Sequence, residues 1–260
     1  MILDELAAHA RERVAAAKTR VPLEEIRAQA EALLRGDFRF EKALSGKGTA
    51  FICEVKKASP SKGVIDLQFD YFGIAGQYEE AGADCISVLT EPKWFLGSDE
   101  IFRAIRLTVD VPMLRKDFTV DEYQIYEAKV MGADAVLLIC ALLDTDKLRE
   151  YLAICDKLGL SALVETHDEA EMQSAVAAGA RLIGVNNRNL RDFSVDLGNA
   201  ARLRAGAPEG TIFVAESGVS CPEDAAKLRQ AGADAILVGE FLMRSLDKKR
   251  ALQALREAAK

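Results

Sequence analysis

The feature that most constrains the fold is a unit repeated four times, a glycine between small residues followed almost at once by an apolar run. The four glycines stand at positions 82, 132, 179 and 232, so successive units lie 50, 47 and 53 residues apart. Each glycine is placed to end a helix, and each run has the length and composition of a buried strand. The apolar runs read CISVLT, AVLLIC, LIGVNN and AILVGE.

Four further strand candidates alternate with these units, at Phe51–Lys56, Val111–Lys116, Ser161–Glu165 and Thr211–Glu216. A helical pattern follows each of the resulting strands. Nearly continuous apolar strands that alternate with helices indicate a parallel sheet. Eight such βα units in about 200 residues predict a (β/α)8 TIM barrel. A doubly wound open sheet is the structural alternative.

Residues 1–48 precede the predicted barrel. Apolar residues recur at helical spacing over 3–19 and 22–35, with Pro22 suited to the first helical position. Phe38 and Phe40 are candidates for docking these helices against the barrel. Because no stretch resembles a linker, we expect residues 1–260 to form one domain, with 1–48 a helical extension packed on the barrel.

Charge and cysteine usage exclude several classes of partner. The net charge is −7, and Lys and Arg are scattered, which argues against binding to nucleic acid or an anionic membrane. No apolar run approaches the roughly 18 residues of a membrane span, and no signal-peptide pattern is present. The five cysteines form no C-x-x-C pair and suggest a reduced, cytoplasmic protein. Two distant histidines are too few for a histidine-based zinc site.

The strand at Phe51–Lys56 ends in charge. Because side chains alternate along a strand, Glu54 and Lys56 share a face with Ile52, whereas Cys53 faces the other way. Two charges on one face of a buried strand are costly unless they are paired or hydrated. A structural ion pair is the simplest explanation for this strand taken alone.

The same pattern recurs at the ends of other predicted strands, where a polar residue continues a line of inward positions. These residues are Lys116, Glu165, Asn186 followed by Arg188, and Glu216. In this fold the catalytic residues lie at the carboxyl ends of the strands. Five independent ion pairs at one rim are improbable, so a shared site is the better explanation.

Two turns that contain glycine predict an anion site. Glu216–Val219 follows the seventh strand and Val238–Phe241 the eighth, where barrels of this type commonly bind phosphate. The glycines could instead only form turns. The sequence THDE at 166–169 resembles a capping box with Thr166 as the cap, which makes His167 a rim residue rather than a base.

The chain at this point resembles the indole-3-glycerol phosphate synthases. The motifs that carry the resemblance span the predicted barrel in order: CEVKKASPSKG, SVLTEPKWFLGS, VPMLRKDF, LVETHDEAE, IGVNNRNL, VAESGV and ILVGE. The resemblance implies conversion of 1-(2-carboxyphenylamino)-1-deoxyribulose 5-phosphate into indole-3-glycerol phosphate, CO2 and water. It also implies that no cofactor or metal is used and that a phosphorylated small molecule is the partner.

The resemblance further implies residue roles. Lys116 matches the general acid of ring closure, with Lys56 as the other candidate, and Glu165 matches the base that takes a proton from the ring nitrogen during dehydration. The remaining catalytic positions are Glu54, Asn186 and Ser217. The residues implied to contact the substrate are Ser59, Phe95, Phe118, Leu137, Arg188 and Glu216. Those implied to bind its phosphate are Ser217, Gly218, Gly239 and the amide of Glu240, whose side chain is expected to point away.

Two rival functions use the same fold. A phosphoribosylanthranilate isomerase resembles this chain in its phosphate site but would need an inward cysteine on the first strand, and Cys53 is predicted to face outward. A phosphate-ligand-binding barrel without catalysis is the other rival, and the presence of Lys56, Lys116 and Glu165 argues against it. A monomer is expected, with a dimer as the alternative.

Overall fold

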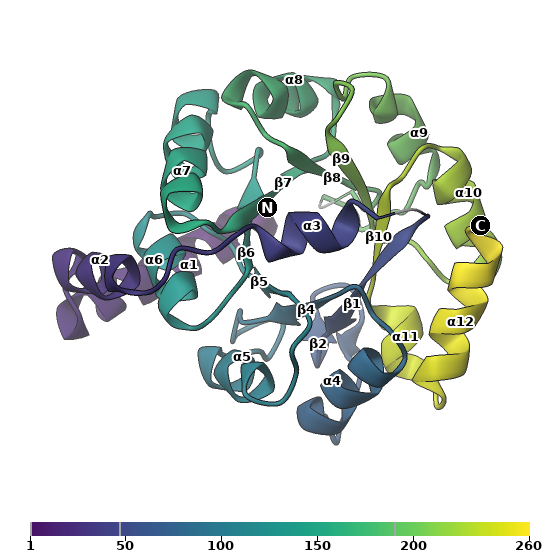
Figure 1. Cartoon of the computed structure of the whole chain (residues 1–260), viewed down its shortest axis with the longest axis horizontal. Coiled ribbons are helices and arrows are strands. Elements are labelled where there is room, and N and C mark those ends of the chain that lie inside the picture. The colour runs from purple at the N-terminus through teal and green to yellow at the C-terminus, as the bar shows by residue number, and fades with distance from the viewer. Residues whose placement is uncertain (1, 47, 190) are drawn as a thin grey trace.

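The computed structural model describes residues 2–46, 48–189 and 191–260, and within these ranges eight parallel strands close into a barrel (Figure 1). This finding confirms the predicted (β/α)8 barrel and excludes the open sheet. The barrel strands are β1 (Ala50–Val55), β4 (Cys85–Leu89), β5 (Met113–Lys116), β6 (Ala135–Ile139), β7 (Ser161–Thr166), β8 (Leu182–Asn186), β9 (Ile212–Glu216) and β10 (Ala235–Val238). A small antiparallel hairpin of β2 (Ala58–Ser59) and β3 (Gly63–Val64) follows β1.

Helices form the outer layer and an extension before the barrel (Figure 1). Those around the barrel are α4 (Tyr71–Glu80), α5 (Asp99–Arg106), α6 (Tyr123–Val130), α7 (Thr145–Leu158), α8 (Glu169–Ala178), α9 (Gly198–Arg204), α10 (Pro222–Gln230), α11 (Glu240–Arg244) and α12 (Lys248–Ala258). The extension contains α1 (Ile2–Arg20), α2 (Leu23–Ala32) and α3 (Arg39–Leu44). No described helix is both long and apolar enough to cross a membrane.

The repeated unit has a physical explanation in the structure. In three of its four copies an aspartate follows the glycine by two positions, and its carboxylate accepts a hydrogen bond from the first part of the preceding strand. Asp84 accepts from Phe51 N at 2.7 Å, Asp134 from Met113 N at 2.9 Å and Asp234 from Phe213 N at 2.9 Å. A backbone N–H without a ladder partner is thereby satisfied, so the aspartates stabilise the amino ends of alternate strands.

The core has two layers because the strands of the barrel are buried on both faces. Inward side chains, including Ile52, Leu114 and Leu163, form an apolar cluster within the barrel. Outward side chains pack under the helices in a larger cluster that contains Cys53, as predicted. The parity of each strand therefore decides which side chains reach the barrel axis.

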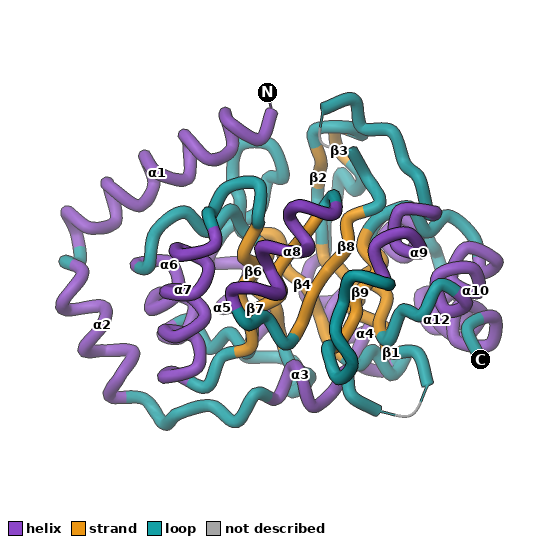
Figure 2. The backbone as a smooth tube through the Cα atoms, turned by 90° about the horizontal axis from the view of Figure 1, so that it is seen from above, coloured by secondary structure: helices purple, strands orange, loops and turns teal. Residues whose placement is uncertain are grey.

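The extension contacts both ends of the barrel. In Figure 2 the amino end of α1 lies on the same side of the molecule as the β2–β3 hairpin, and α3 lies on the opposite side. Phe40 of α3 is fully buried in the inner cluster, which confirms its predicted docking, and Glu41 N donates to Ser161 Oγ at 3.3 Å. Phe38 is only partly buried, at the amino end of α3, with the Arg181 guanidinium 4.8 Å from its ring centroid.

Two local predictions are wrong. Pro22 is the residue before α2 and not its first residue. Thr166 does not cap α8, because it continues β7 opposite Val185 and its hydroxyl donates to Gly184 O at 3.1 Å. Asp168 is the cap and accepts from Glu171 N at 2.9 Å.

Candidate active site

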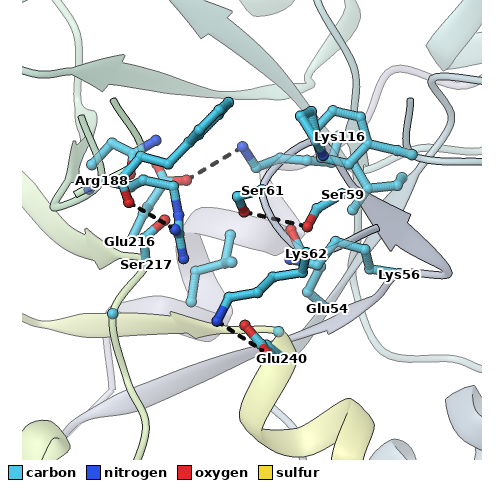
Figure 3. Close-up of a pocket in the computed structure, with 18 of the residues that line it drawn as sticks. Glu54, Lys56, Ser59, Ser61, Lys62, Lys116, Arg188, Glu216, Ser217 and Glu240 are labelled. Atoms are coloured by element: carbon cyan, nitrogen blue, oxygen red, sulfur yellow. Dashed lines mark hydrogen bonds and ion pairs between the residues drawn. The ribbon is translucent and has the colours of Figure 1, made fainter. Parts of the chain in front are cut away.

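A cavity of about 550 Å³ opens at the carboxyl ends of the barrel strands (Figure 3). All of the site residues predicted from the sequence line this one cavity. They are Glu54, Lys56, Ser59, Phe95, Lys116, Phe118, Leu137, Glu165, Asn186, Arg188, Glu216, Ser217, Gly218, Gly239 and Glu240. The period-two alternation of each strand explains this convergence, because Glu54, Lys116 and Glu216 each lie two residues beyond a buried inward side chain.

Lys116 is the central cation of the cavity. Its Nζ lies 3.2 Å from Glu165 Oε2 and 3.4 Å from Glu216 Oε2. Both carboxylates are almost completely buried, at 3% and 2% side-chain exposure. Burial opposes the charged ammonium, but the carboxylates of Glu165, Glu216 and Glu54 outweigh this effect and raise the pKa of Lys116. The lysine is therefore protonated at neutral pH.

The two carboxylates beside Lys116 have opposite pKa shifts. Burial and then the charges of Glu165 and Glu54 raise the pKa of Glu216 to about 8, against the opposing effect of Lys116. For Glu165 the charges of Lys116 and His167, together with Asn186, outweigh burial and lower the pKa. These shifts favour the ionised form of Glu165 and the protonated form of Glu216. Environments that separate the pKa values of neighbouring acids are typical of acid–base sites.

Glu54 and Lys56 form the ion pair that the strand pattern suggested. Lys56 Nζ donates to Glu54 Oε2 at 2.5 Å. The pair lies directly against Gly239, where an added Cβ would come within 2.4 Å of Glu54 Oε2 and 2.9 Å of Lys56 Nζ. Gly239 therefore provides the space that the pair occupies, in addition to belonging to the predicted phosphate turn.

A second glycine makes room for Glu216. Gly184 faces the barrel axis on β8, and an added Cβ there would lie 2.1 Å from Glu216 Oε1 and 3.1 Å from Leu163 Cδ1. Among the described residues Glu216 Oε1 is a buried oxygen without a hydrogen-bond partner. That oxygen can carry the proton that Glu216 keeps because its pKa is raised, or it can accept a hydrogen bond from the substrate.

The turns after β9 and β10 lie at one edge of the cavity. Ser217 and Gly218 both have positive φ angles, 66° and 94°, so the backbone makes a tight turn at these two residues. Successive amides in such a turn can bind an anion. Glu240 Oε1 accepts from Arg244 Nε at 3.0 Å and lies 3.6 Å from Lys62 Nζ, which ties its carboxylate to two cations (Figure 3).

The opposite edge of the cavity is apolar. The rings of Phe95 and Phe118 are 6.1 Å apart between centroids, and Leu137 lies below them in the inner cluster.

Two further predicted residues have polar partners. Arg188 donates from Nη1 to Phe193 O at 3.1 Å, which fixes it beside the loop after β8. Ser59 is buried in the hairpin, 3.5 Å from Ser61 between hydroxyl oxygens.

Sequence reasoning missed several side chains of the cavity. Ile2 and Leu6 reach it from α1, and Phe193, Val195 and Leu197 reach it from the loop after β8. None carries a chemical signal, since apolar residues on a helix or loop resemble ordinary core residues.

Asp117 connects the extension to the end of β5. Its carboxylate accepts hydrogen bonds from Arg13 Nη2 at 2.6 Å and from Thr90 Oγ1 at 2.6 Å. It also accepts one from the backbone N of the next residue, Phe118, at 2.8 Å. Arg115 is 3.9 Å away. Arg13 Nη1 also donates to Asp117 Oδ2 at 3.0 Å, so the pair is bidentate and holds α1 beside the strand that carries Lys116. Among the described residues no group of three or more His, Cys, Asp or Glu is suited to a metal ion.

The fold and the site together define a (β/α)8 barrel in which buried lysines and glutamates share one cavity with two glycine-containing turns at the carboxyl ends of the strands. The family model for indole-3-glycerol phosphate synthase matches residues 3–255. The indole-3-glycerol phosphate synthase of Ruminiclostridium cellulolyticum is 54% identical over the full length of both chains. That of Endomicrobium trichonymphae is 50% identical over 99% of this chain and 100% of its own.

The chain therefore belongs to the indole-3-glycerol phosphate synthase family. Its reaction is the family's: the carboxy-lyase step of tryptophan biosynthesis, which forms indole-3-glycerol phosphate, CO2 and water. Solved structures at lower identity share only the fold. A 3-hexulose-6-phosphate synthase superimposes with a TM-score of 0.64 at 18% identity, covering 82% of this chain and 100% of its own. A thiamine phosphate pyrophosphorylase from Pyrococcus furiosus gives 0.61 at 17%, covering 81% and 95%.

Proposed function

We propose that the three chemical steps take place around Lys116, with this lysine as general acid and Glu165 as general base. The observation that carries the proposal is the position of the Lys116 ammonium, 3.2 Å from one buried carboxylate and 3.4 Å from another. The pKa values of these two carboxylates are shifted in opposite directions, down for Glu165 and up for Glu216. This arrangement supplies a proton donor and a proton acceptor on neighbouring, largely buried side chains.

Ring closure needs a proton donor. The aromatic carbon that bears the carboxylate attacks the ketone carbon, a C–C bond forms, and the ketone oxygen becomes a hydroxyl by taking a proton from Lys116. The C–carboxylate bond then breaks, CO2 leaves, and its electron pair restores the aromatic ring. An ammonium is suited to the first step because it stabilises negative charge as the charge develops on oxygen.

Dehydration needs an acid and a base together. The new hydroxyl leaves as water with a proton from Lys56 or Lys116, and the ring nitrogen gives a proton to Glu165. Loss of a proton from the adjacent ring CH2 and return of a proton to the nitrogen then complete the aromatic indole. Glu54 holds Lys56 in place through their 2.5 Å contact. Asn186 contacts a substrate hydroxyl, and Glu216 faces the anilino end of the substrate.

The remaining cavity residues bind the two ends of the substrate. We assign the phosphate to Ser217, Gly218, Gly239 and the amide of Glu240, because the two turns present backbone groups at one edge. The aromatic ring is assigned to the slot of Phe95, Phe118 and Leu137. Arg188 and Ser59 are assigned to the substrate carboxylate.

The same proposal covers the organisation of the chain. We propose that residues 1–260 act as one domain and as a monomer in the cytoplasm. The exposed large apolar residues include Leu67, Leu107 and Leu246, which lie in three separate loops of the chain, and this separation supports the monomer. Sedimentation velocity over a range of concentrations tests it, and a stable dimer would contradict it.

The assignment of roles is tested by following indole fluorescence from the carboxyphenylamino substrate. Lys116→Ala should lose rate by roughly three orders of magnitude or more, within the range attributed to general acids and charge stabilisation, while a phosphate analogue still binds. Glu165→Gln should instead accumulate an intermediate before dehydration. Wild-type turnover in Lys116→Ala would refute its role as the acid, and unchanged kinetics in Glu165→Gln would refute that of the base.

A further inference from the structure

His167 occupies a fixed position beside the proposed base. It follows β7 directly, two residues after Glu165. Three hydrogen bonds fix it: its backbone N and its Nδ1 lie 2.8 Å and 3.1 Å from Glu171 Oε2, and its carbonyl accepts from Asn199 Nδ2 at 3.1 Å. The ring therefore has little freedom to turn.

The other ring nitrogen faces the active site. His167 Nε2 lies 3.5 Å from Glu165 Oε1, and among the described residues it is a buried nitrogen without a hydrogen-bond partner. A second cavity, also of about 550 Å³, is lined by both His167 and Glu171. His167 thus lies beside the buried base and also borders a polar cavity.

The contact partners determine where the protons lie. A carboxylate only accepts hydrogen bonds, so the contact with Glu171 places a proton on Nδ1. A neutral ring would then direct its Nε2 lone pair at the Glu165 carboxylate, which is repulsive. A proton on Nε2 removes this repulsion and gives an imidazolium between two carboxylates.

We propose that His167 is a positioning residue, an imidazolium anchored by Glu171 that keeps the buried Glu165 ionised and aimed at the substrate. The inference rests on the proposed role of Glu165 as the base. It changes the interpretation of His167 from a rim residue to a group that acts through its neighbour. No bond to the substrate is required of it.

The surrounding charges favour this protonation state. Burial lowers the pKa of His167, but the hydrogen bond to Glu171 and the charges of Glu165, Glu171 and Glu216 outweigh burial and raise it. The charged residues that line the adjoining cavity have both signs: Asp168, Arg188, Arg191, Asp196 and Arg202. Reciprocally, His167 is among the groups that lower the pKa of Glu165.

Nuclear magnetic resonance can test the coupling without reference to activity. The chain has only two histidines, so ¹⁵N-histidine labelling gives two sets of ring signals, and His9→Gln assigns them. We expect Glu165→Gln and Glu171→Gln each to lower the pKa of His167 by about one pH unit or more, since each removes a carboxylate in contact with the ring. Glu169→Gln, an exposed neighbour on the same helix, should leave the titration unchanged. An unchanged titration in Glu165→Gln overturns the inference.

The pH dependence of kcat provides the second test. In His167→Gln the cation is lost, so the pKa of Glu165 rises and the acid limb of kcat moves about one pH unit higher, with rate recovered at higher pH. A merely structural role would lower kcat equally at every pH, which would overturn the inference.

The two variants together separate this inference from the proposed function. If Glu165→Gln keeps wild-type turnover, the proposed base and this inference fail together. If Glu165→Gln loses turnover but the acid limb does not move in His167→Gln, this inference fails alone.

Discussion

The two ends of the barrel are built from the same eight strands, yet their inward side chains have opposite properties. At the amino ends α3 covers the barrel, and Phe40 and Leu44 complete a fully apolar cluster. At the carboxyl ends the cavity is lined by Lys56, Lys116 and four glutamates. Along β7 the change from Leu163 to Glu165 takes a single inward step.

The difference shows how one fold separates stability from chemistry. Apolar burial at the closed end contributes free energy of folding, whereas the buried charges at the open end cost desolvation free energy and are useful only for the reaction. Substitutions at the closed end should therefore affect unfolding, and those at the open end turnover. Four experiments test this division.

The largest effect is expected at the closed end. Phe40→Ala removes a fully buried ring from the inner cluster and should lower the free energy of unfolding by about 3–5 kcal/mol. The kcat of the folded fraction should stay within about twofold of wild type. Urea unfolding and the fluorescence assay measure the two quantities. Phe72→Ala is the matched control because Phe72 is 45% exposed, and a loss of kcat in Phe40→Ala without a loss of stability would break the comparison.

Gly184→Ala should act on the open end. The new methyl group would lie 2.1 Å from Glu216 Oε1, so the carboxylate must shift from its present position 3.4 Å from Lys116 Nζ. Misplacement of a catalytic group by about 1 Å can cost about 100-fold, and we expect a fall in kcat of that order. Gly76→Ala is the control, since a Cβ meets nothing within 4 Å there. Equal kcat values for Gly184→Ala and wild type would contradict the proposed tight seat of Glu216.

The raised pKa of Glu216 predicts a pH dependence of stability. Its value in the folded protein, about 8, lies above the ordinary value of 4.5, so the native state retains a proton that the unfolded state releases. The stabilisation is present below about pH 4.5 and is lost as the pH rises to about 8, with a slope of at most about 1.4 kcal/mol per pH unit. Glu216→Gln should remove this slope from urea unfolding measured between pH 5 and 9. Parallel profiles for the variant and wild type would exclude a protonated Glu216, and the exposed Glu209→Gln serves as control.

The smallest effect is expected at the hairpin. Lys62 Nζ lies 3.6 Å from Glu240 Oε1 with both side chains partly exposed, so Lys62→Ala should change the free energy of unfolding by less than about 1 kcal/mol. We expect KM to rise a few-fold, with kcat unchanged, and the difference to vanish in 1 M salt, where the screening length is about 3 Å. Lys249→Ala on α12 is the control. A tenfold or larger fall in kcat would instead place Lys62 in the chemistry.

The inward positions of the strands could be predicted from sequence because each depends on a local period of two. Once the repeat indicates a parallel barrel, the side chains of Lys116, Glu165 and Glu216 must point toward one axis at one end. The contacts of Lys116 with Glu165 and Glu216 follow from that geometry. The same reasoning placed Cys53 on the outer face.

Features set by distant parts of the chain could not be predicted in this way. Arg13 binds Asp117 across 104 positions, and Ile2 reaches the cavity only because α1 docks there. Thr166 looked like a cap, but pairing of β7 with β8 extends the strand by one residue and moves the cap to Asp168. That shift also sets the direction of His167. Here the pairing of two strands, and not the local capping-box pattern, determines where the helix begins.

The contacts of the extension determine when it can fold. Its helices are the first part of this chain to be synthesised, yet they bind residues that follow much later: Arg13 pairs with Asp117, and Gly36 N donates to Leu158 O at 2.9 Å. Such non-local contacts form slowly because a long loop must close first. On the ribosome the extension must therefore wait until the strands from β5 to β7 have emerged. Its docking marks the completion of the central part of the barrel during synthesis.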